Sequence, residues 1–357
     1  MINIFERFPG LIEALPHVSL ADLPTPVQDA GKVGRCRLWI KRDDLTGRLY
    51  GGNKLRKLEF LLGNALRAGH RRVFTFGVAG SNHALATSIY AAALGLRSIP
   101  LLTPQTNAAY TRRNLLVQLH VGARLRHFPR ELDAEAAGSL LERVARRPAM
   151  RIKGGGSSPL GTLGYVNAGL ELAGQIQSGE CPRPDAIYVA LGTMGTAAGL
   201  SLGLRAAGLD VPVVMIRVVR DTIANPTSYR RLYAATADLL RRHDLRFPRF
   251  SAPAAEPDIR HDHIGAGYAR FTPEGMDAVA WAAGEKGLKL EGTYTGKAMA
   301  ALREAAASQR NRTLLFWNTY NSRPLPSAAL ERDWRSLPGD FHEYFTRPLQ
   351  PLDPESR

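Results

Sequence analysis

Cysteine is almost absent from this sequence, which contains only Cys36 and Cys181 among 357 residues. Two cysteines cannot build the disulfide framework of a secreted scaffold, and their scarcity favours a reducing cytoplasm. The sequence also lacks an apolar run long enough to cross a bilayer, and residues 1–9 lack the charged and then apolar pattern of a signal peptide. With 45% hydrophobic residues and a mean hydropathy of -0.18, we expect a globular cytoplasmic protein with no membrane partner.

Acidic residues are outnumbered by basic ones, and the formal net charge is +15. The basic residues occur as isolated pairs, such as Arg71-Arg72 and Arg230-Arg231, without a basic stripe that contains interleaved aromatic residues. Because such a stripe is the usual signature of a nucleic-acid-binding face, we predict no nucleic-acid partner. The excess charge is more consistent with a general attraction for small anionic substrates. We also predict no metal site.

Short runs of β-branched and aromatic residues alternate along the chain with segments of helical periodicity. This alternation predicts βαβ units, and hence an α/β fold whose parallel sheets are covered on both faces. We expect strands at residues 37–41, 72–76, 98–102, 186–190, 211–216 and 313–317. Helices are expected at residues 54–68, 82–94, 110–120, 132–146, 161–177, 196–207, 273–286 and 296–309. The length of the chain favours about two domains.

A lysine follows a glycine-rich turn at the start of one expected helix. The sequence Gly51-Gly52-Asn53-Lys54 comes after a short apolar strand that ends in Lys41-Arg42-Asp43-Asp44. The N-terminus of a helix carries partial positive charge, which disfavours a protonated amine there. A lysine with a lowered pKa is a nucleophile that can form a Schiff base with an aldehyde, whereas the alternative is an ordinary surface lysine.

A second glycine-rich turn, Gly192-Thr193-Met194-Gly195-Thr196, lies between an expected strand and an expected helix. Glycines allow the backbone to approach a ligand, and successive N–H groups together with the helix dipole hold an anion such as phosphate. The loop lacks the Lys-Ser/Thr of a Walker motif and a full G-x-G-x-x-G, so a nucleotide site is only weakly supported. Taken alone, the same glycines are also consistent with a purely structural turn.

Two further turns place polar side chains beside expected helices. Ser81, Asn82 and His83 follow a predicted strand, at the sheet edge where open parallel sheets bind ligands. Helix capping alone would also explain Ser81. Tyr294 precedes a Thr-Gly turn and Tyr268 follows a Gly-Ala-Gly segment. Tyr294 could act as an acid/base group at a cleft, although a lone tyrosine is more often a core residue.

Taken together, these motifs resemble the pyridoxal-phosphate enzymes of fold type II, the tryptophan-synthase-β-like fold. More narrowly, the chain resembles the D-cysteine desulfhydrase and 1-aminocyclopropane-1-carboxylate deaminase family. The resemblance runs from Leu23-Pro24-Thr25-Pro26 to about Thr319, and its most specific parts are the Lys-Arg-Asp-Asp and Gly-Gly-Asn-Lys runs and the Ser-Asn-His turn.

The resemblance implies two parallel-sheet α/β domains with the cofactor in the cleft between them. The expected boundaries are residues 1–45 and 160–345 for a large cofactor-binding domain and residues 46–159 for a small domain. Residues 346–357 are expected to form a surface tail. We also expect a homodimer.

The resemblance also implies a role for each motif. Lys54 would hold pyridoxal 5'-phosphate covalently and later move protons at the substrate Cα. Asn82 would bond the hydroxyl of the pyridoxal ring, and Ser81 would bond the substrate carboxylate. The phosphate would be held by backbone N–H groups of the loop formed by Gly192, Thr193, Met194, Gly195 and Thr196.

The remaining roles concern the substrate and the ring nitrogen. The side chains implied to border the substrate, besides Ser81 and Asn82, are His83, Tyr268, Tyr294 and Tyr320. Either Thr319 or Thr295 would face the ring nitrogen, where a neutral hydroxyl moderates the electron withdrawal by the ring.

Two positions favour the D-cysteine desulfhydrase type. The cyclopropane deaminases typically have glutamate after the tyrosine and glutamine after Ser-Asn, whereas this chain has Thr295 and His83. One departure concerns the last strand, where the family usually has His-Thr-Gly-Gly and this chain has Asn318-Thr319-Tyr320-Asn321. The side chains of Tyr320 and Asn321 are therefore expected to intrude on the ring or substrate side.

The activity implied by the resemblance is a lyase or deaminase that acts on a small amino acid, expected in the D configuration. Elimination of a β-substituent would release a 2-oxo acid and ammonia. The alternatives of the same fold are a 1-aminocyclopropane-1-carboxylate deaminase, a sulfonate-eliminating enzyme and a β-replacement enzyme. A ligand-binding homologue without catalysis is the alternative from another class.

Overall fold

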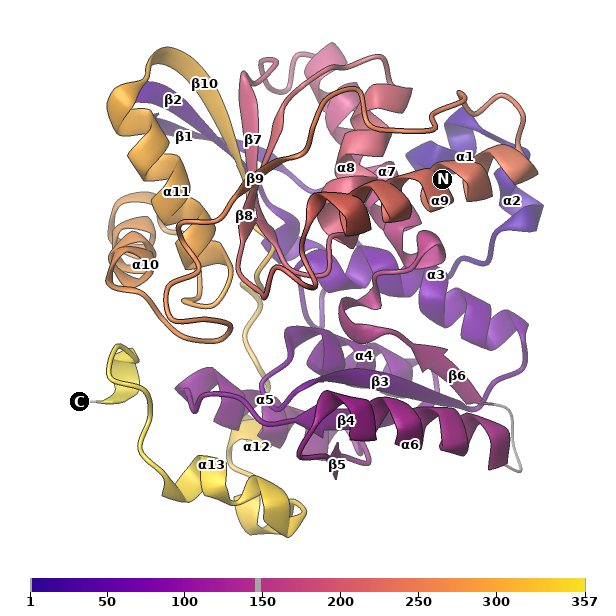
Figure 1. The fold of residues 1–357 in the computed structure, drawn as a ribbon, viewed down its shortest axis with the longest axis vertical. Coiled ribbons are helices and arrows are strands. Elements are labelled where there is room, and N and C mark those ends of the chain that lie inside the picture. The colour runs from indigo at the N-terminus through magenta and orange to yellow at the C-terminus, as the bar shows by residue number, and fades with distance from the viewer. Residues whose placement is uncertain (1, 145–148, 357) are drawn as a thin grey trace.

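The computed structural model describes residues 2–144 and 149–356. Its strands form two separate sheets, the larger in the upper part of Figure 1 and the smaller in the lower part. Both sheets are mostly parallel, so the expected α/β fold is confirmed. Within the described residues, no helix combines the length and the apolar character needed to cross a membrane.

The larger sheet has the strand order β1-β2-β10-β7-β8-β9. These strands are β1 (Val27–Val33), β2 (Arg35–Lys41), β10 (Arg310–Trp317), β7 (Ala186–Leu191), β8 (Val213–Arg217) and β9 (Asp258–Arg260). β1 runs antiparallel to β2, and the other neighbours are parallel. The central strand β7 reads Ala-Ile-Tyr-Val-Ala-Leu, which is the continuous apolar run of a strand covered on both faces.

The smaller sheet has the order β5-β4-β3-β6, and all its strands are parallel. These strands are β5 (Arg126–His127), β4 (Arg97–Thr103), β3 (Arg72–Val78) and β6 (Ala149–Ile152).

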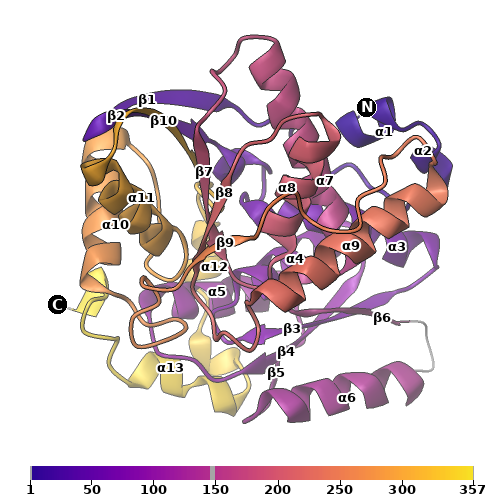
Figure 2. The same cartoon turned by 45° about the horizontal axis from the view of Figure 1, so that its top comes forward.

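Helices flank both sheets (Figures 1 and 2). The long helices are α3 (Asn53–Arg67), α4 (Asn82–Ala93), α5 (Ala109–His120), α6 (Glu131–Val144), α7 (Pro159–Gln177), α8 (Gly195–Ala206), α9 (Pro226–His243), α10 (Pro273–Lys286) and α11 (Thr295–Ser308). The short helices are α1 (Asn3–Arg7), α2 (Leu11–Ala14), α12 (Ser327–Leu330) and α13 (Glu343–Thr346). Single 3₁₀ turns lie at Asp43–Leu45, Gly154–Gly156, Trp334–Ser336, Gly339–Phe341 and Pro354–Ser356.

Alternate residues of β7 show how the larger sheet is covered. Ile187 and Val189 belong to the core that includes α7, α8 and α9, whereas Tyr188 and Ala190 belong to the core that includes α10 and α11. Because successive side chains of a strand point to opposite faces, these two helix groups cover opposite faces of the sheet. In the smaller sheet, Leu101 packs with α6, and the adjacent Leu102 packs with α5. Figure 2 shows α6 lying beside this sheet.

The eight expected helices are all present, and each begins within two residues of its expected start. The helix expected at 132–146 is seen as α6 (Glu131–Val144), and residues 145 and 146 lie outside the described residues. The six expected strands are also present, with β10 beginning three residues earlier than expected. Helix α9 and strand β1 were not expected from the sequence.

A buried cluster of charged residues joins α3 to the larger sheet. Arg56 of α3 donates to both carboxylate oxygens of Asp43 and to Glu171 of α7. Lys41, at the end of β2, donates to Glu171 at 2.6 Å. All four side chains are almost completely buried. The Lys-Arg-Asp-Asp run therefore holds the helix that carries Lys54 against the larger sheet.

The C-terminal segment after α13 runs back along the surface toward α10 (Figures 1 and 2). Most of residues 346–356 are exposed or partly exposed, but Gln350 and Asp353 are only 8% and 4% exposed. Both side chains make hydrogen bonds to distant parts of the chain, so this surface segment is anchored to the fold.

Candidate active site

A cavity of about 580 Å³ lies between the two sheets. The carboxyl ends of β3, β4 and β7 and the first turns of α3, α4, α8 and α11 line it, which is the place where parallel sheets bind ligands. The residues predicted for the site that line the cavity are Lys54, Ser81, Asn82, His83, Gly192, Thr193, Met194, Thr196, Tyr268, Tyr294, Thr295, Thr319 and Tyr320. Gly195, the buried first residue of α8, is the one residue of the predicted glycine-rich turn that does not line the cavity.

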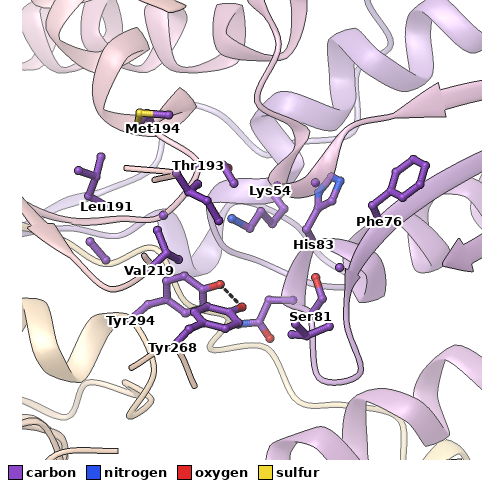
Figure 3. A pocket seen from close by; sticks show the side chains of 18 of the residues that line it. Lys54, Phe76, Ser81, His83, Leu191, Thr193, Met194, Val219, Tyr268 and Tyr294 are labelled. Carbon is purple, nitrogen blue, oxygen red and sulfur yellow. Dashed lines mark hydrogen bonds between the residues drawn. The ribbon is translucent and has the colours of Figure 1, made fainter. Parts of the chain in front are cut away.

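Lys54 is the second residue of α3 and projects toward Thr193 and Tyr294 (Figure 3). The preceding Gly52 has a φ of 92°, a conformation that favours glycine. The Lys54 amine lies 5.9 Å from the centre of the Tyr294 ring and makes no hydrogen bond within the described residues. Burial lowers the pKa of Lys54 to about 8, and the Glu291 carboxylate partly opposes this shift. Burial is therefore the largest cause of the lowered pKa of Lys54.

The first turn of α4 presents Ser81 and Asn82 to the cavity. Ser81 caps the helix by accepting a hydrogen bond from the Ala84 N–H at 3.2 Å. The side-chain oxygen of Asn82 accepts hydrogen bonds from the Tyr50 hydroxyl at 3.3 Å and from the Asn114 amide at 3.1 Å. Because these bonds occupy the oxygen of Asn82, its amide group remains available to donate into the cavity.

His83 is only 2% exposed, and its ring faces the cavity beside Lys54 (Figure 3). Neither ring nitrogen has a hydrogen bond of full geometry within the described residues, although the Lys153 backbone lies close enough to interact with the ring. Burial and the nearby Lys54 and Lys57 charges lower the pKa of His83 well below its usual value. The imidazole is therefore neutral at pH 7 and can both donate and accept a hydrogen bond.

The glycine-rich turn between β7 and α8 meets a serine from the start of α7. The hydroxyl oxygens of Ser157 and Thr193 lie 2.7 Å apart, and Ser157 accepts from the Gly195 N–H at 3.2 Å. The Lys57 amine donates to the same Ser157 oxygen at 3.2 Å and to the Gly155 carbonyl at 3.1 Å. Two hydroxyls, one amine and the N-terminus of α8 thus converge at one wall of the cavity.

Lys57 has no carboxylate partner in the described part of the chain. Burial, together with the nearby Lys54 charge, lowers the pKa of Lys57 well below its usual value. A bound anion would restore the charge of this amine. At the other side of the turn, the Asn53 amide donates to the Thr196 hydroxyl at 3.0 Å, and Met194 has a left-handed φ of 64°. These features fit a tight anion cradle better than a purely structural turn.

Tyr268 and Tyr294 face the amine of Lys54 from the opposite wall. Their hydroxyl oxygens are 2.6 Å apart, as the dashed line in Figure 3 shows, and their rings are perpendicular. Burial and the neighbouring Tyr268 raise the pKa of Tyr294 well above its usual value. Burial also raises the pKa of Tyr268 to about 12, although the bond to Tyr294 opposes this shift. Both phenols are therefore protonated at pH 7, so neither can act as a base there.

Glu291 fixes the backbone that carries Tyr294. Its carboxylate accepts hydrogen bonds from the N–H groups of Thr293 at 2.8 Å, Tyr294 at 2.7 Å and Thr295 at 3.0 Å. Burial raises the pKa of Glu291, whereas these hydrogen bonds act in the opposite direction. The side chain also lines the cavity, and it attracts the positive charge of Lys54.

The two threonines expected near a ring nitrogen differ in their bonding. The Thr295 hydroxyl oxygen accepts from the Glu291 N–H at 2.9 Å. The Thr319 hydroxyl makes no hydrogen bond to any described residue and lines the cavity. Thr319 is therefore the better placed of the two to bond a ligand.

Tyr320 and Asn321 behave differently, although both were expected to intrude on the site. Tyr320 lines the cavity, and the Lys289 amine lies 5.7 Å from the centre of its ring. The expectation is wrong for Asn321, because its side chain turns away from the cavity. Its amide oxygen accepts from the Gly51 N–H at 2.7 Å and from the Arg323 N–H at 3.0 Å. Asn321 therefore fixes the turn before Lys54.

Residues 18–319 match the family described as pyridoxal-phosphate dependent enzyme. The chain belongs to this family. Its expected cofactor, pyridoxal phosphate, and its expected class, a pyridoxal-phosphate-dependent lyase or deaminase, are therefore confirmed.

Curated relatives and a solved structure support the membership. The chain is 34% identical to a protein of Pyrococcus horikoshii named putative 1-aminocyclopropane-1-carboxylate deaminase, over 87% of this chain and 93% of the relative. It is also 34% identical to a D-cysteine desulfhydrase of Serratia proteamaculans, over 85% of this chain and 93% of the relative. A crystal structure of a homologue of 1-aminocyclopropane-1-carboxylate deaminase has a TM-score of 0.75 at 32% identity and covers 89% of this chain and 94% of that one.

The cavity of this pyridoxal-phosphate-dependent enzyme fits the cofactor that the family uses. A buried amine without a hydrogen bond, Lys54, is the group that an aldehyde requires. A second buried amine without a carboxylate partner, Lys57, lies beside hydroxyls and the N-terminus of α8, which is the donor set that a phosphate requires. The amide of Asn82 and the hydroxyl of Thr319 supply further polar groups for the ring.

Three residues of the site were missed by the sequence analysis. Lys57 and Ser157 belong to the site through contacts between segments that are far apart in the sequence. Glu291 belongs to it because its carboxylate caps the start of α11. Lys57 lies one helical turn after Lys54, so the same helix face was a usable signal. The Gly-Gly-Gly-Ser run before α7 gives no indication in the sequence that Ser157 lies beside Thr193.

Substitution of Gly195 is expected to weaken binding of the cofactor phosphate. A Cβ at Gly195 would lie 2.6 Å from the Ser157 hydroxyl and 3.0 Å from the Lys57 amine, so it would displace both. Gly195→Asp adds a negative charge as well, and we expect its affinity for pyridoxal phosphate, measured by titration of the cofactor-free protein, to fall by about 100-fold. Gly174→Asp is the matched control, because it adds the same charge at an exposed position of α7, where a Cβ meets nothing within 4 Å. Equal affinities of the wild type and the Gly195→Asp variant would show that this turn does not hold the phosphate.

Proposed function

We propose that this enzyme eliminates the β-substituent of a small D-amino acid, in the manner of a D-cysteine desulfhydrase, and releases a 2-oxo acid and ammonia. The observation that carries the proposal is the arrangement of Lys54 opposite the hydrogen-bonded pair Tyr268 and Tyr294. An amine able to remove a proton and a phenol able to supply one are the two groups that an elimination needs. Thr295 and His83, together with the relatives named D-cysteine desulfhydrase, favour this activity over that of a cyclopropane deaminase.

We propose that the substrate carboxylate binds at the first turn of α4. The Ser81 hydroxyl lines the cavity there, and the N-terminus of a helix of this length favours a negative charge. The amide of Asn82 would bond the ring hydroxyl of the cofactor, and the Thr319 hydroxyl would bond the ring nitrogen. His83 and Tyr320 would border the rest of the substrate, and residues 192–196 with Lys57 and Ser157 would hold the phosphate.

The proposed reaction assigns one proton movement to each wall of the cavity. When bound, pyridoxal phosphate supplies an electron-withdrawing ring that weakens the bonds at the substrate Cα. Lys54 removes the proton from Cα, and the bond between Cβ and the leaving group breaks. Tyr294 donates its phenolic proton to that leaving group. The Tyr268 hydroxyl, whose oxygen lies 2.6 Å away and can act as donor or acceptor, then donates to the phenolate oxygen. For D-cysteine, water then completes the conversion into pyruvate, hydrogen sulfide and ammonia.

The experiment that tests this function is an assay of keto-acid and ammonia release from a panel of amino acids. The panel contains D-cysteine, L-cysteine, L-cysteate and 1-aminocyclopropane-1-carboxylate. We expect release from small D-amino acids with a β-leaving group to exceed release from the L-amino acids. Preferential release of 2-oxobutyrate from the cyclopropane substrate would favour the deaminase, and the absence of any keto acid would favour a protein without catalysis.

Tyr294→Phe is expected to lower turnover by about 100-fold or more, the size of a lost acid/base group. The substitution removes the hydroxyl that lies 2.6 Å from Tyr268 but keeps the ring, so packing and stability change little. Steady-state turnover on the best substrate, together with a thermal unfolding curve, measures both effects. If turnover stays at the wild-type level, Tyr294 is a packing residue.

Tyr320→Gly is expected to shift relative turnover toward D-cysteine by about 10-fold. The wild type carries a bulky ring where the family usually has glycine, so we expect its turnover of D-cysteine to be weaker than that of a small amino acid with another β-group. The ratio of kcat/KM values for D-cysteine and for the best substrate of the panel measures the shift. Tyr320→Phe is the matched control because it keeps the ring, and an unchanged ratio in Tyr320→Gly would place this residue outside the substrate pocket.

We also propose the domain organisation and the assembly. Every strand of the larger sheet lies within residues 1–45 and 160–345, and every strand of the smaller sheet lies within residues 46–159, which supports these ranges as the large and small domains. A homodimer in the cytoplasm remains our proposal for the assembly and the location, and size-exclusion chromatography with light scattering tests the former.

A further inference from the structure

The loop that carries Tyr268 makes few hydrogen bonds of its own. Gly265 and Gly267 have φ values of 62° and 132°, and Ala269 has a left-handed φ of 58° that is unfavourable for a residue with a Cβ. Between residues 264 and 271, the only internal backbone hydrogen bond runs from the Arg270 N–H to the Gly267 carbonyl at 3.3 Å. The position of Tyr268 must therefore be fixed by other parts of the chain.

Two side chains hold this loop on either side of Tyr268. Lys297, one turn after Tyr294 in α11, donates to the Ile264 carbonyl at 2.7 Å and to the Gly267 carbonyl at 3.4 Å. On the other side, Gln350 of the C-terminal segment donates from its amide to the Ala269 carbonyl at 3.2 Å.

Gln350 also accepts a hydrogen bond from the Phe271 N–H at 2.9 Å. Its side chain thus bonds one carbonyl and one N–H of the loop and is only 8% exposed. A buried primary amide that pairs with two backbone groups constrains the loop more than a single contact would.

The same C-terminal segment is attached to the other side of the cleft. The Gln350 N–H donates to the Asn107 carbonyl at 3.1 Å. The Asp353 carboxylate accepts from the Ala109 N–H at 2.8 Å, at the first residue of α5, and Asp353 is only 4% exposed. Since α5 packs on the smaller sheet and the Tyr268 loop belongs to the larger part, residues 350–353 join the two sides of the cavity.

We propose that Gln350 and Asp353 are positioning residues, which form a strap that sets Tyr268 against Tyr294 and couples this pair to the smaller sheet. The proposal rests on the proposed function, because that function gives the tyrosine pair its catalytic role. Neither residue lines the cavity, so both act through the loop and not on the substrate. The 2.6 Å contact between the two tyrosine hydroxyls would then depend on Gln350 and Asp353, which lie more than 50 positions away from either tyrosine along the chain.

The test compares four variants with the wild type. Gln350→Ala removes the two side-chain hydrogen bonds to the loop, and Asp353→Ala removes the hydrogen bond to the first residue of α5. Asp353→Asn keeps a side-chain oxygen that can accept from the Ala109 N–H, so it is the conservative variant. Arg347→Ala is the matched control in the same segment, because the Arg347 side chain is exposed and pairs with Glu343, four residues before it, rather than with α5.

The first readout is amide hydrogen exchange of residues 264–272 in the cofactor-free protein, which needs no substrate. We expect exchange at Phe271 and its neighbours to rise by about 10-fold in Gln350→Ala and Asp353→Ala, the scale of one lost hydrogen bond. Asp353→Asn and Arg347→Ala should exchange like the wild type. Unchanged exchange of this segment in both alanine variants, or an equal rise across the whole protein, would overturn the strap.

The second readout is the split between kcat and KM on the best amino acid of the substrate panel. A misplaced phenol affects proton donation, so we expect kcat to fall by about 10-fold in both alanine variants while KM changes less. Raised exchange with unchanged kcat would overturn the link to catalysis. If the wild type itself releases no keto acid, the proposed function fails, whereas the exchange result still decides whether the strap holds the loop.

Discussion

Replacing Lys54 by alanine is expected to lower turnover by about 10⁴-fold or more and to abolish covalent capture of pyridoxal phosphate. The residue serves as both the nucleophile for the cofactor and the base at Cα, so its loss removes two contributions at once. The burial that lowers the pKa of Lys54 to about 8 leaves about a tenth of the amine unprotonated at pH 7, far more than for an ordinary lysine. An arginine at this position could not replace it, because its guanidinium stays charged.

Two other buried lysines, Lys57 and Lys297, are alternative candidates for the residue that carries the cofactor. The Lys57 amine already bonds Ser157 and Gly155, at the wall where we place the phosphate. Burial also lowers the pKa of Lys297 to about 8, but this amine bonds two carbonyl groups of the Tyr268 loop and does not line the cavity. Only the Lys54 amine both lines the cavity and lacks a hydrogen bond among the described residues.

Borohydride reduction of the cofactor-loaded protein, followed by peptide mapping, identifies the lysine that carries pyridoxal phosphate. We expect the label on Lys54, and no covalent label in Lys54→Ala. A label on Lys57 or Lys297 in the wild type would contradict the assignment. Because capture needs the unprotonated amine, the rate of cofactor uptake by the apo-protein should also rise with pH through about 8.

The parts of the site that follow one strand or begin one helix were predictable from the sequence. Lys54, the Ser81 turn and residues 192–196 each combine a strand end, glycine or a capping residue and a helix start, all within about ten residues. Parallel strands bring such turns to one edge of a sheet, so local patterns sufficed to place these groups in one cavity. The tyrosine pair was predicted residue by residue, but its hydrogen bond joins two loops that no local pattern connects.

Helix α9 shows why part of the fold was missed. It begins with Asn225 and Pro226, a pair that also signals a turn, although the proline takes the first helical position and Asn225 caps the helix. Its buried face is a narrow stripe that includes Tyr229, Tyr233 and Leu240, and arginines occupy much of the rest. Strand β1 was missed for a different reason, because it is an edge strand in which only Val33 is buried.

The charged motif before Lys54 was recognised as specific, but its physical role depends on partners that lie far away in the sequence. Asp43 accepts hydrogen bonds from Arg56, from the Tyr165 hydroxyl at 2.6 Å and from the Trp317 indole at 2.7 Å. These partners come from α3, α7 and β10. Sequence spacing gives no indication that these residues are neighbours, so the role of the motif as a buried anchor for the helix that carries Lys54 could not be predicted.

Arg56→Met is expected to lower the free energy of unfolding by about 3–5 kcal/mol, the cost of leaving buried charges without their partner. Asp43 and Glu171 would lose the guanidinium, while the methionine approximately keeps the volume of the side chain. Urea unfolding of the cofactor-free protein measures the change. Arg37→Met is the matched control, since Arg37 pairs with Asp29 at the surface with 62% of its side chain exposed, and it should cost less than about 1 kcal/mol.

The pH dependence of this loss identifies its cause. Burial alone would raise the pKa of Glu171, but the charges of Arg56 and Lys41 overcome this effect and lower the pKa to about 2. A carboxyl whose pKa is lowered by folding contributes stability that is present above its unfolded pKa of about 4.3 and is lost as the pH falls toward 2. The difference between the wild type and Arg56→Met should therefore be largest near pH 7 and shrink below about pH 4. A difference that stays constant down to pH 3 would show that packing, rather than the charge pairing of Arg56, accounts for the loss.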